Sequence, residues 1–372
     1  MKNKKILMIA TTDNMLWQFL MPHIDRLIEM GNQVECVCAR TGFWFSELAQ
    51  KYTTHEIDFR RNPFHPKNFV AYFKLQKLCR LRQYDVVYCQ QPVGSAMGRV
   101  IGAQFKIPVI YTAHGFHFFK GCKLVNKLIY KNAERFLNRY TTALITINEE
   151  DFEAGLKMKA KHVFKINGIG MKLDKYEPLT ETKDEIRKSL GINDDEFVIT
   201  TIAEYIKRKN FDTMLRTIKE LKNKNRNVKF LVCGCGKLEK KIKKMISKLG
   251  IENEVMLLGY RKDINRVLSA SDLFMLASFQ EGLPLAIIEA MNFSLPCVVS
   301  DVRGNRDLIL NGKGGYVLPA KDYQGFSNAI AKIMDSADLK DQFSSFNFAE
   351  SKKYDIDLVI KQLDEIYNQL DI

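Results

Sequence analysis

Two carboxylates stand close together in an otherwise uncharged stretch near the three-quarter point of the chain. Glu281 and Glu289 are separated by seven uncharged residues in the segment SDLFMLASFQEGLPLAIIEAMNFSLPCVVSD. The runs DLFMLAS and PCVVSD are typical of buried strands. A helix is expected between them, with Pro284 at its first position and continuing through Leu285 to about Phe293. This βαβ pattern places the Glu281 loop at the carboxyl end of a strand, where open parallel sheets bind ligands.

The start of this helix can hold an anion, because unpaired backbone N–H groups and the positive end of the helix dipole meet there. Glu289 lies roughly 7.5 Å further along the helix among apolar neighbours, and we expect its carboxylate to need a hydrogen-bond donor. A ribose diol supplies two hydroxyls at about that distance from a phosphate, and Glu281 would then contact a group beyond the diphosphate. This order fits a nucleotide-sugar. The alternative is that Glu289 points to solvent from an amphipathic helix.

The positive charge of the chain is concentrated in its first half. The formal net charge is +14, and residues 1–170 hold 25 Lys and Arg against 13 Asp and Glu, whereas the remainder holds 32 against 30. Cations recur at every fourth position at Lys123, Lys127, Lys131, Arg135 and Arg139. On a helix they form one stripe of like charges that repel each other, which an anionic surface relieves. The stripe predicts a membrane-facing helix; an ordinary solvated helix face is the alternative.

Aromatic residues near these cations favour the membrane interpretation. Phe116, Phe118 and Phe119 precede the stripe and are expected to insert at the interface, and RRNPFHPKNFVAYFKLQKLCRLR is a second basic and aromatic stretch. The apolar run near the N-terminus is too short for a signal peptide, and no stretch approaches the roughly 20 apolar residues that span a bilayer. We expect a cytoplasmic protein attached peripherally to the inner face of the cell membrane.

Strand-like and helix-like segments alternate along the whole chain. The strand-like segments are KILMIAT, VECVCAR, DVVYCQQ, PVIYTAH and ALITINE in the first half, and FVITTIA, VKFLVCG, VMLLGY, DLFMLAS and PCVVSD in the second. This alternation predicts parallel sheets, and 372 residues exceed what one core usually holds, roughly 250 to 300 residues. We expect domains at 1–168 and 169–350, with residues 351–372 forming a helix that packs back on the first domain.

The eight cysteines form no CxxC pair. Cys36 and Cys38, like Cys233 and Cys235, alternate within apparent strands, so both members of each pair should point to one face. Buried free thiols are therefore expected rather than zinc ligands.

The order of these motifs resembles the family 4 retaining glycosyltransferases of the GT-B fold. EGLPLAIIE, preceded by ASDLFMLAS and followed by PCVVSDVRGNRDLI, is similar to that family's signature, and YTAHGFHFFKG, ITINEEDFEAG and INGIGMKLDKY resemble bacterial capsule and exopolysaccharide enzymes. The resemblance implies an α/β fold with two Rossmann-like, doubly wound parallel-sheet domains facing a cleft. It further implies transfer of a sugar from a nucleotide diphosphate-sugar, expected to be a UDP-sugar, to a lipid-diphosphate-linked saccharide, without a metal or cofactor.

The resemblance also assigns roles in the donor site. Glu289 would hold the ribose hydroxyls and Glu281 a hydroxyl of the donor sugar, while the segment Gly282, Leu283, Pro284 and Leu285 would bind sugar and phosphates. The loop near Arg261 and Asp263 would cradle the base. CGCGK resembles a Gly-x-Gly turn that lets the backbone approach the ligand.

A basic pair clamps the diphosphate in this family, since the leaving group gains negative charge in the transition state. Lys209 matches the lysine of the pair, but Glu204 stands where the arginine is expected. Arg208 is the residue that would compensate.

In the N-terminal half, His114 matches a family histidine that donates a hydrogen bond to a hydroxyl of the donor sugar. Thr12, Asp13 and Asn14 replace the glycine-rich loop common in the wider family and are expected on the acceptor side. Asp13 is either an acceptor-side base or an N-cap of the following helix.

Two other functions are compatible with parts of this pattern. Nucleotide-sugar 2-epimerases share the two-domain architecture and would change the donor without an acceptor. The basic half alone would suit a nucleic-acid-binding protein, but the chain lacks an RNA-reading aromatic signature or a helix-turn-helix pattern, so nucleic acid is not an expected partner.

Overall fold

The computed structural model describes residues 1–42, 44–176, 179–370 and 372, which fall into two compact units. Unit 1 comprises Met1–Gly170 and Ile356–Ile372, and unit 2 comprises Met171–Asp355. The chain therefore leaves unit 1 after Gly170 and returns to it with its last helix.

Unit 1 is built on a parallel sheet in the order β3-β2-β1-β4-β5-β6-β7. Its strands are β1 Lys5–Thr12, β2 Gln33–Ala39, β3 Thr53–Glu56, β4 Val86–Gln90, β5 Val109–Ala113, β6 Ala143–Thr146 and β7 His162–Lys165. The central strands are apolar and buried along almost their whole length, as expected of parallel strands covered on both faces.

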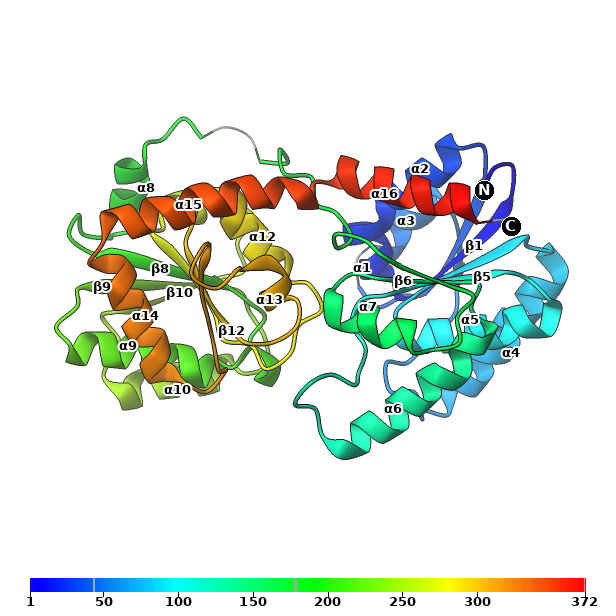
Figure 1. The fold of residues 1–372 in the computed structure, drawn as a ribbon, viewed down its shortest axis with the longest axis horizontal. Coiled ribbons are helices and arrows are strands. Elements are labelled where there is room, and N and C mark those ends of the chain that lie inside the picture. The colour runs from blue at the N-terminus through cyan, green and yellow to red at the C-terminus, as the bar shows by residue number, and fades with distance from the viewer. Residues whose placement is uncertain (43, 177–178, 371) are drawn as a thin grey trace. The chain divides into compact units, whose positions relative to one another are not determined.

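Helices cover both faces of this sheet, with α2 and α3 on one side and α4 and α5 on the other (Figure 1). The helical segments are α1 Asp13–Met15, a π-helical turn Leu16–Leu20, α2 Met21–Glu29, α3 Phe45–Lys51, α4 Lys67–Arg82, α5 Pro92–Phe105, α6 Leu124–Leu137, a 3₁₀ turn Asn138–Tyr140, α7 Glu149–Leu156 and the C-terminal α16 Ile356–Gln369. An ion pair between Arg26 and Asp364, at 2.7 Å, joins α2 to α16.

Unit 2 contains a second parallel sheet, in the order β10-β9-β8-β11-β12-β13. Its strands are β8 Phe197–Ile202, β9 Val228–Cys233, β10 Val255–Gly259, β11 Leu273–Leu276, β12 Cys297–Ser300 and β13 Gly315–Leu318. The two predicted parallel sheets are confirmed. The sequence patterns missed β3, β7 and β13, each four residues long and each on an edge of its sheet, where the apolar signal is weakest.

In unit 2, α9 and α10 lie on one face of the sheet and α12 and α15 on the other (Figure 1). The helical segments are α8 Lys183–Ser189, a 3₁₀ turn Lys207–Lys209, α9 Phe211–Asn223, α10 Glu239–Leu249, α11 Ile264–Ala270, α12 Leu285–Asn292, α13 Asn305–Leu308, α14 Tyr323–Met334, α15 Ala337–Ser351 and a 3₁₀ turn Lys352–Tyr354. A capping box between Thr182 and Glu185 begins α8.

The sheet order decides which loops meet. β8 and β11 are neighbours although two strands separate them in sequence, and β1 and β4 stand in the same relation in unit 1. Because the strand order reverses at these points, the loops that follow the two strands diverge and leave room for a ligand. The Lys207–Lys209 turn follows β8 and the Glu281 loop follows β11, so both lie at the switch point of unit 2.

One cysteine differs from the expected pattern. Cys36, Cys38 and Cys233 are buried free thiols, but Cys235 is exposed. The alternation argument was wrong there because β9 ends at Cys233 and its neighbour lies in the following loop.

Candidate functional site

Glu281 is the centre of a buried charge cluster in unit 2. Its side chain is only 6% exposed, and its two oxygens contact Lys209 Nζ and Arg208 Nη1, each at 2.7 Å. Burial by itself would raise the pKa of the Glu281 carboxyl, but Lys209 and then Arg208 hold it below its ordinary value. Two cations thus share one carboxylate, and a net positive charge remains to attract an anion.

The turn that carries these cations is fastened to the Glu281 loop. Arg208 Nη1 also donates to the Gln280 carbonyl at 2.7 Å, and the Phe279 amide donates to the Arg208 carbonyl at 2.8 Å. Buried Asn210, in the left-handed conformation, donates through its amide nitrogen to the Ala277 carbonyl at 2.8 Å. These bonds hold the β8 and β11 loops as one arrangement.

A third loop, which follows β12, contacts the backbone of the Glu281 loop. Buried Arg303 donates through Nε to the Glu281 carbonyl at 3.0 Å. Gly304, with φ +77°, lies so close that a Cβ there would be 2.3 Å from the Gly282 carbonyl oxygen. The sequence analysis did not single out Arg303. Its position after strand PCVVSD, at the same sheet edge, was the available signal.

Helix α12 begins close to the expected place. Pro284 is the residue before the helix, with φ −75° and ψ 115°, rather than its first helical residue, and no described side chain caps the start. The Ile287 amide donates to the Pro284 carbonyl at 3.1 Å, whereas the Leu285 and Ala286 amides have no partner among the described residues. These two amides are therefore available to an anion, and the positive end of the helix dipole adds to the charge of the neighbouring Arg208 and Lys209.

Glu289 has donor partners within the protein. Its Oε1 accepts from Lys175 Nζ at 2.5 Å and from the Tyr176 hydroxyl at 2.7 Å, whereas Oε2 has no hydrogen-bond partner among the described residues. Burial and then the Glu289 carboxylate raise the pKa of Tyr176. The argument that an apolar setting leaves this carboxylate dependent on a ligand was wrong, because its partners lie more than 110 residues earlier in the chain.

The predicted base loop is charged and paired within itself. Arg261 donates through Nε to Asp263 Oδ1 at 2.8 Å, just before α11, and Arg261 lowers the pKa of Asp263. Arg266 lies 3.5 Å from the same carboxylate.

The Gly-x-Gly turn serves the fold of unit 2 itself. A Cβ at Gly234 would lie 2.0 Å from the Ala203 carbonyl oxygen, and one at Gly236 would lie 2.9 Å from the Tyr205 backbone. The absence of side chains at Gly234 and Gly236 thus lets the backbone of the loop after β8 pack directly against this turn. The space beside these two glycines is therefore occupied by the protein itself.

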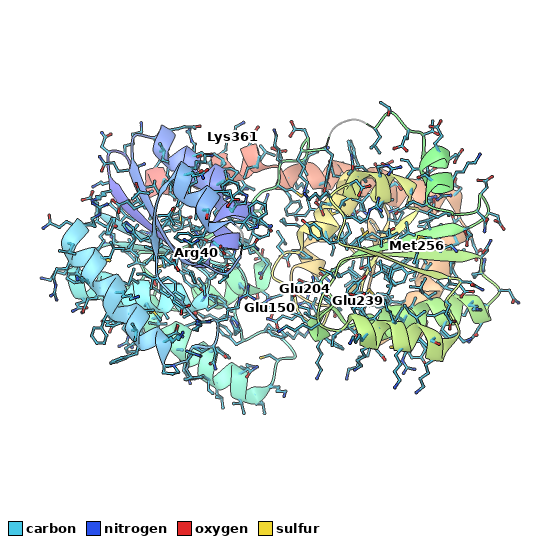
Figure 2. The ribbon with its side chains drawn as sticks, turned by 180° about the vertical axis from the view of Figure 1, so that it is seen from behind. Arg40, Glu150, Glu204, Glu239, Met256 and Lys361 are labelled. Atoms are coloured by element: carbon cyan, nitrogen blue, oxygen red, sulfur yellow. The ribbon has the colours of Figure 1, made fainter. Side chains whose placement is uncertain are left out.

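Glu204 is exposed, in the loop between β8 and the Lys207–Lys209 turn. Its side chain makes no hydrogen bond or ion pair with another described residue, and its backbone carbonyl accepts a hydrogen bond from the Ile206 amide at 2.8 Å. Figure 2 labels Glu204 together with Glu239, the first residue of α10; both residues follow strands at the carboxyl end of the unit 2 sheet. The residue at the expected arginine position is thus not part of the cluster around Glu281.

In unit 1, His114 follows β5 and is partly buried. Its Nε2 lies 2.7 Å from Gln90 Oε1. Burial, and secondarily the nearby His23, lower the pKa of His114 to about 3. Its imidazole is therefore neutral at ordinary pH.

Asp13 is fully buried at the end of β1. Its carboxylate accepts from the Thr41 hydroxyl at 2.5 Å and from the Gly42 amide at 3.2 Å, so it fastens the loop after β2. The N-cap position of α1 belongs to Thr12, whose side chain makes no capping bond, and Asn14 is partly buried. Asp13 is therefore neither an N-cap nor exposed in the way an acceptor-side base requires.

The cationic stripe lies along α6, with Lys123 before the helix and Arg139 in the following 3₁₀ turn. All five cations are exposed. Every residue of α6 is in the described part of the chain, and none is buried. The helix is fastened to its unit through Glu134, which binds the fully buried Arg99 of α5 at 2.7 Å.

Large apolar side chains of α6 and α4 are also exposed. Their exposed fractions reach 75% at Leu124 and 64% at Leu128 in α6, and 70% at Phe69 in α4. The aromatic residues expected to insert at a membrane behave differently: Phe116 and Phe118 are buried and stack on each other in the core, with ring centroids 4.9 Å apart. For these two residues the expectation was wrong, because they pack into the core of unit 1. Phe119 is partly exposed, and α6 carries the exposed apolar residues.

Within the described ranges, no cluster of three or more His, Cys, Asp or Glu side chains is arranged to hold a metal ion. Within those ranges, no helix combines the length and the apolar character needed to cross a bilayer.

Two family models match the chain. Residues 182–348 match the model described as glycosyl transferases group 1, and residues 5–148 match the model described as glycosyl transferase 4-like. The first covers the β8, β11 and α12 cluster of unit 2, and the second covers His114 and strands β1 to β6 of unit 1.

Proteins with similar sequences and folds are glycosyltransferases. A Bacillus subtilis protein described as a glycosyltransferase, EpsD, is 30% identical over 371 residues, covering 98% of this chain and 96% of its own. The UDP-Gal:α-D-GlcNAc-diphosphoundecaprenol α-1,3-galactosyltransferase of Escherichia coli is 32% identical over 275 residues, covering 72% and 71%. The crystal structure of Anabaena HepE in complex with UDP and glucose superposes with a TM-score of 0.81 at 19% identity, over 99% and 100% of the two chains.

Proposed function

The chain belongs to the family 4 glycosyltransferases of the GT-B fold, and we propose that it moves a sugar from a UDP-sugar to a lipid-diphosphate-linked saccharide in surface polysaccharide synthesis. The observation that carries this proposal is the cluster in which Arg208 and Lys209 share buried Glu281 beside the start of α12. Family membership leaves the 2-epimerase alternative without support.

The donor site has the charge that a nucleotide diphosphate needs. Arg208, Lys209 and the α12 amides form a cationic site for the diphosphate, and Glu289 Oε2, which has no partner among the described residues, faces the ribose hydroxyls. Glu281, whose carboxylate lies between Arg208 and Lys209, contacts a hydroxyl of the transferred sugar. The Arg261 and Asp263 loop lies before α11 and holds the base.

The reaction needs no protein nucleophile. The bond between the anomeric carbon and the β-phosphate oxygen breaks, a bond to the acceptor oxygen forms on the same face, and the acceptor hydroxyl proton passes to the departing phosphate. Negative charge grows on the diphosphate as it leaves. The fixed cations Arg208 and Lys209 therefore lower the barrier by stabilising that charge in the transition state more than in the ground state.

The proposed acceptor saccharide is attached to a lipid, and unit 1 exposes the apolar and cationic side chains of α6 that would suit a membrane surface. The Escherichia coli relative acts on a diphosphoundecaprenol-linked sugar, as its name states. Leu124 and Leu128 of α6 lie among the stripe cations, so the helix suits an anionic interface. We infer that α6 and α4 rest on the cytoplasmic face of the membrane, where the acceptor is held.

Sugar transfer is tested by incubating the protein with UDP-galactose, UDP-glucose, UDP-N-acetylglucosamine or UDP-N-acetylgalactosamine and membrane extract, with mass detection of the lipid-linked product. One donor should give a product one sugar heavier, and Lys209→Met should abolish it while the protein stays folded. Donor alone should not change into another nucleotide-sugar. Transfer at the wild-type rate by Lys209→Met would overturn the donor-site assignment.

A further inference from the structure

Gln90 and His114 form a buried pair at the ends of two neighbouring strands. Gln90 is the last residue of β4, His114 follows β5, and the two strands pair in parallel with Gln90 opposite Thr112. Gln90 is almost completely buried. Its contact with His114, 2.7 Å long, therefore has little competition from water. The pair lies at the carboxyl edge of the unit 1 sheet, where parallel sheets bind ligands.

The orientation of the Gln90 amide follows from its two neighbours. Its nitrogen faces the Met8 sulfur at 3.7 Å, and its oxygen faces His114 Nε2 at 2.7 Å. In the flipped orientation the Gln90 amide oxygen would face the Met8 thioether, which can only accept a hydrogen bond. The lone pairs of that oxygen and of the sulfur would then repel each other. The amide oxygen therefore accepts, and His114 Nε2 must carry a hydrogen.

The second nitrogen of His114 is left as an acceptor. Burial keeps the imidazole neutral, so a proton on Nε2 leaves Nδ1 without one. No described residue donates to Nδ1. The titratable neighbour that acts on His114 is His23 of α2, itself buried, with its pKa lowered and its Nε2 2.6 Å from the Ile169 carbonyl. Positive charges on both imidazoles would repel each other, which also opposes protonation of His114.

We propose that Gln90 is a positioning residue that holds His114 in the Nε2–H tautomer, so that Nδ1 accepts a hydrogen bond from a sugar hydroxyl. The inference rests on the proposed function, since the sugar is a ligand of the glycosyltransferase. It reverses the direction of the hydrogen bond that the family resemblance implies for His114. The hydroxyl belongs to the donor sugar or to the acceptor saccharide, and the chemistry is the same in both.

A hydrogen-bond acceptor at the position of His114 Nδ1 selects among sugars. A hydroxyl can donate to Nδ1, whereas a carboxylate offers only lone pairs and a deoxygenated sugar offers no group at all. A partner left without its hydrogen bond loses affinity because the desolvated acceptor stays unpaired. His114 thus favours a sugar with a free hydroxyl at one position over the deoxy-sugar or the uronate.

The tautomer can be measured on the free protein by ¹⁵N NMR with labelled histidine. The chain has six histidines, and the ring signals lost in His114→Ala assign that residue. Wild-type protein should show the Nε2–H tautomer, and Gln90→Leu should show a mixture. The control Gln104→Leu removes an exposed glutamine of α5 that bonds Gln76, and it should leave His114 unchanged. A protonated Nδ1 in wild type, or an unchanged tautomer in Gln90→Leu, would overturn the proposal.

Kinetics identify the source of the hydroxyl. Monodeoxy analogues of whichever UDP-sugar supports transfer test the donor sugar, and the lipid-linked saccharide acceptor with one hydroxyl removed tests the acceptor. A single deoxy analogue, either of the donor or of the acceptor, should have a kcat/KM roughly 10- to 100-fold below that of the complete sugar with the wild-type protein. The same comparison should show a much smaller difference with Gln90→Leu. Gln90→Glu places a carboxylate beside Nε2 and favours the imidazolium, so its activity should rise with pH. Equal discrimination in wild type and Gln90→Leu would refute the inference. Absence of transfer by wild-type protein would instead count against the proposed function and leave the NMR result standing.

Discussion

Arg208 Nη1 contacts Glu281 Oε2 at 2.7 Å, four residues after the position at which the family places its arginine. Lys209 Nζ reaches the other oxygen of the same carboxylate at the same distance. Glu204, at the usual arginine position, is exposed and belongs to a different part of the loop. Two cations that are adjacent in sequence therefore meet at one carboxylate in this chain and are fastened to the β11 loop.

Arg208 should be required for transfer. Arg208→Ala removes one of the two cations that we propose for the leaving diphosphate, and we expect kcat to fall about 10²-fold, as for loss of one preorganised donor to a developing charge. Glu204→Arg restores an arginine at the family position and should recover part of this loss when combined with Arg208→Ala. The measurement is initial rate under saturating donor.

Lys207→Ala is the matched control, because Lys207 lies in the same turn but is exposed. It should transfer at close to the wild-type rate. Equal rates for Arg208→Ala and Lys207→Ala would mean that the clamp consists of Lys209 and the α12 amides alone.

Glu289 should determine donor affinity more than catalytic rate. Glu289→Ala removes the carboxylate that we propose as the acceptor for the ribose hydroxyls, and hydrogen bonds to a charged group contribute about 1.5–3 kcal/mol each. We expect Kd for UDP, measured by calorimetry, to rise at least 10-fold. Tyr176→Phe removes one hydroxyl from Oε1 and should change Kd less. Exposed Glu252→Ala is the control, and a Kd in Glu289→Ala equal to that of this control would refute the ribose assignment.

Helix α6 should bind anionic vesicles. Lys127→Glu with Lys131→Glu reverses two cations of the stripe, and each cation near an anionic surface changes binding roughly fivefold. Co-sedimentation with phosphatidylglycerol vesicles should therefore fall strongly, and Leu124→Ser with Leu128→Ser should reduce it further by removing apolar contact.

The control for this prediction lies in unit 2. Lys240→Glu with Lys244→Glu reverses two exposed cations of α10 and changes the net charge of the chain equally. If these variants lose vesicle binding to the same extent, the attraction comes from net charge and not from α6.

Stability should fall as the pH is lowered below about 6.5. Burial lowers the pKa values of His23 and His114, so both stay neutral in the folded protein while their unfolded forms titrate near 6.5. Below that pH the unfolded chain binds protons that the folded chain does not, so the free energy of unfolding decreases, for His114 until about pH 3. Urea unfolding at about pH 7.5 and about pH 5.5 measures this, and His114→Gln should weaken the dependence.

Carboxylates do not account for that window. Glu281 and Asp272 have lowered pKa values, so the stability they contribute is lost only below their ordinary values of 4.5 and 3.8. A free energy of unfolding at about pH 5.5 that equals or exceeds the value at about pH 7.5 would contradict the neutral state of the two histidines.

The chain contains two tryptophans, and they stack on each other at the carboxyl edge of the unit 1 sheet. Trp17 and Trp44 have ring centroids 5.5 Å apart and both are partly exposed. Apolar faces of sugars pack on such rings, so lipid-linked saccharide should change the intrinsic fluorescence and UDP alone should not. Trp17→Phe should remove the change. A response to UDP alone would argue against an acceptor-side location.

Sequence patterns were sufficient for the architecture and for the donor loop. Alternating apolar segments predicted the parallel sheets, since burial on both faces leaves a continuous apolar run that is visible locally. The start of α12 and the position of Glu281 after β11 followed from local signals as well. These features depend on residues within one βαβ unit.

The partners of the charged groups required the fold. Glu281 meets Arg208 across more than 70 residues because β8 and β11 are neighbours, and Glu289 meets Tyr176 across more than 110. The burial of Phe116 and the contact of Asp13 with the loop after β2 were likewise invisible in the local pattern. Hydrophobic periodicity records which face of an element is buried, whereas the pairing of side chains depends on which strand ends the topology brings to one edge.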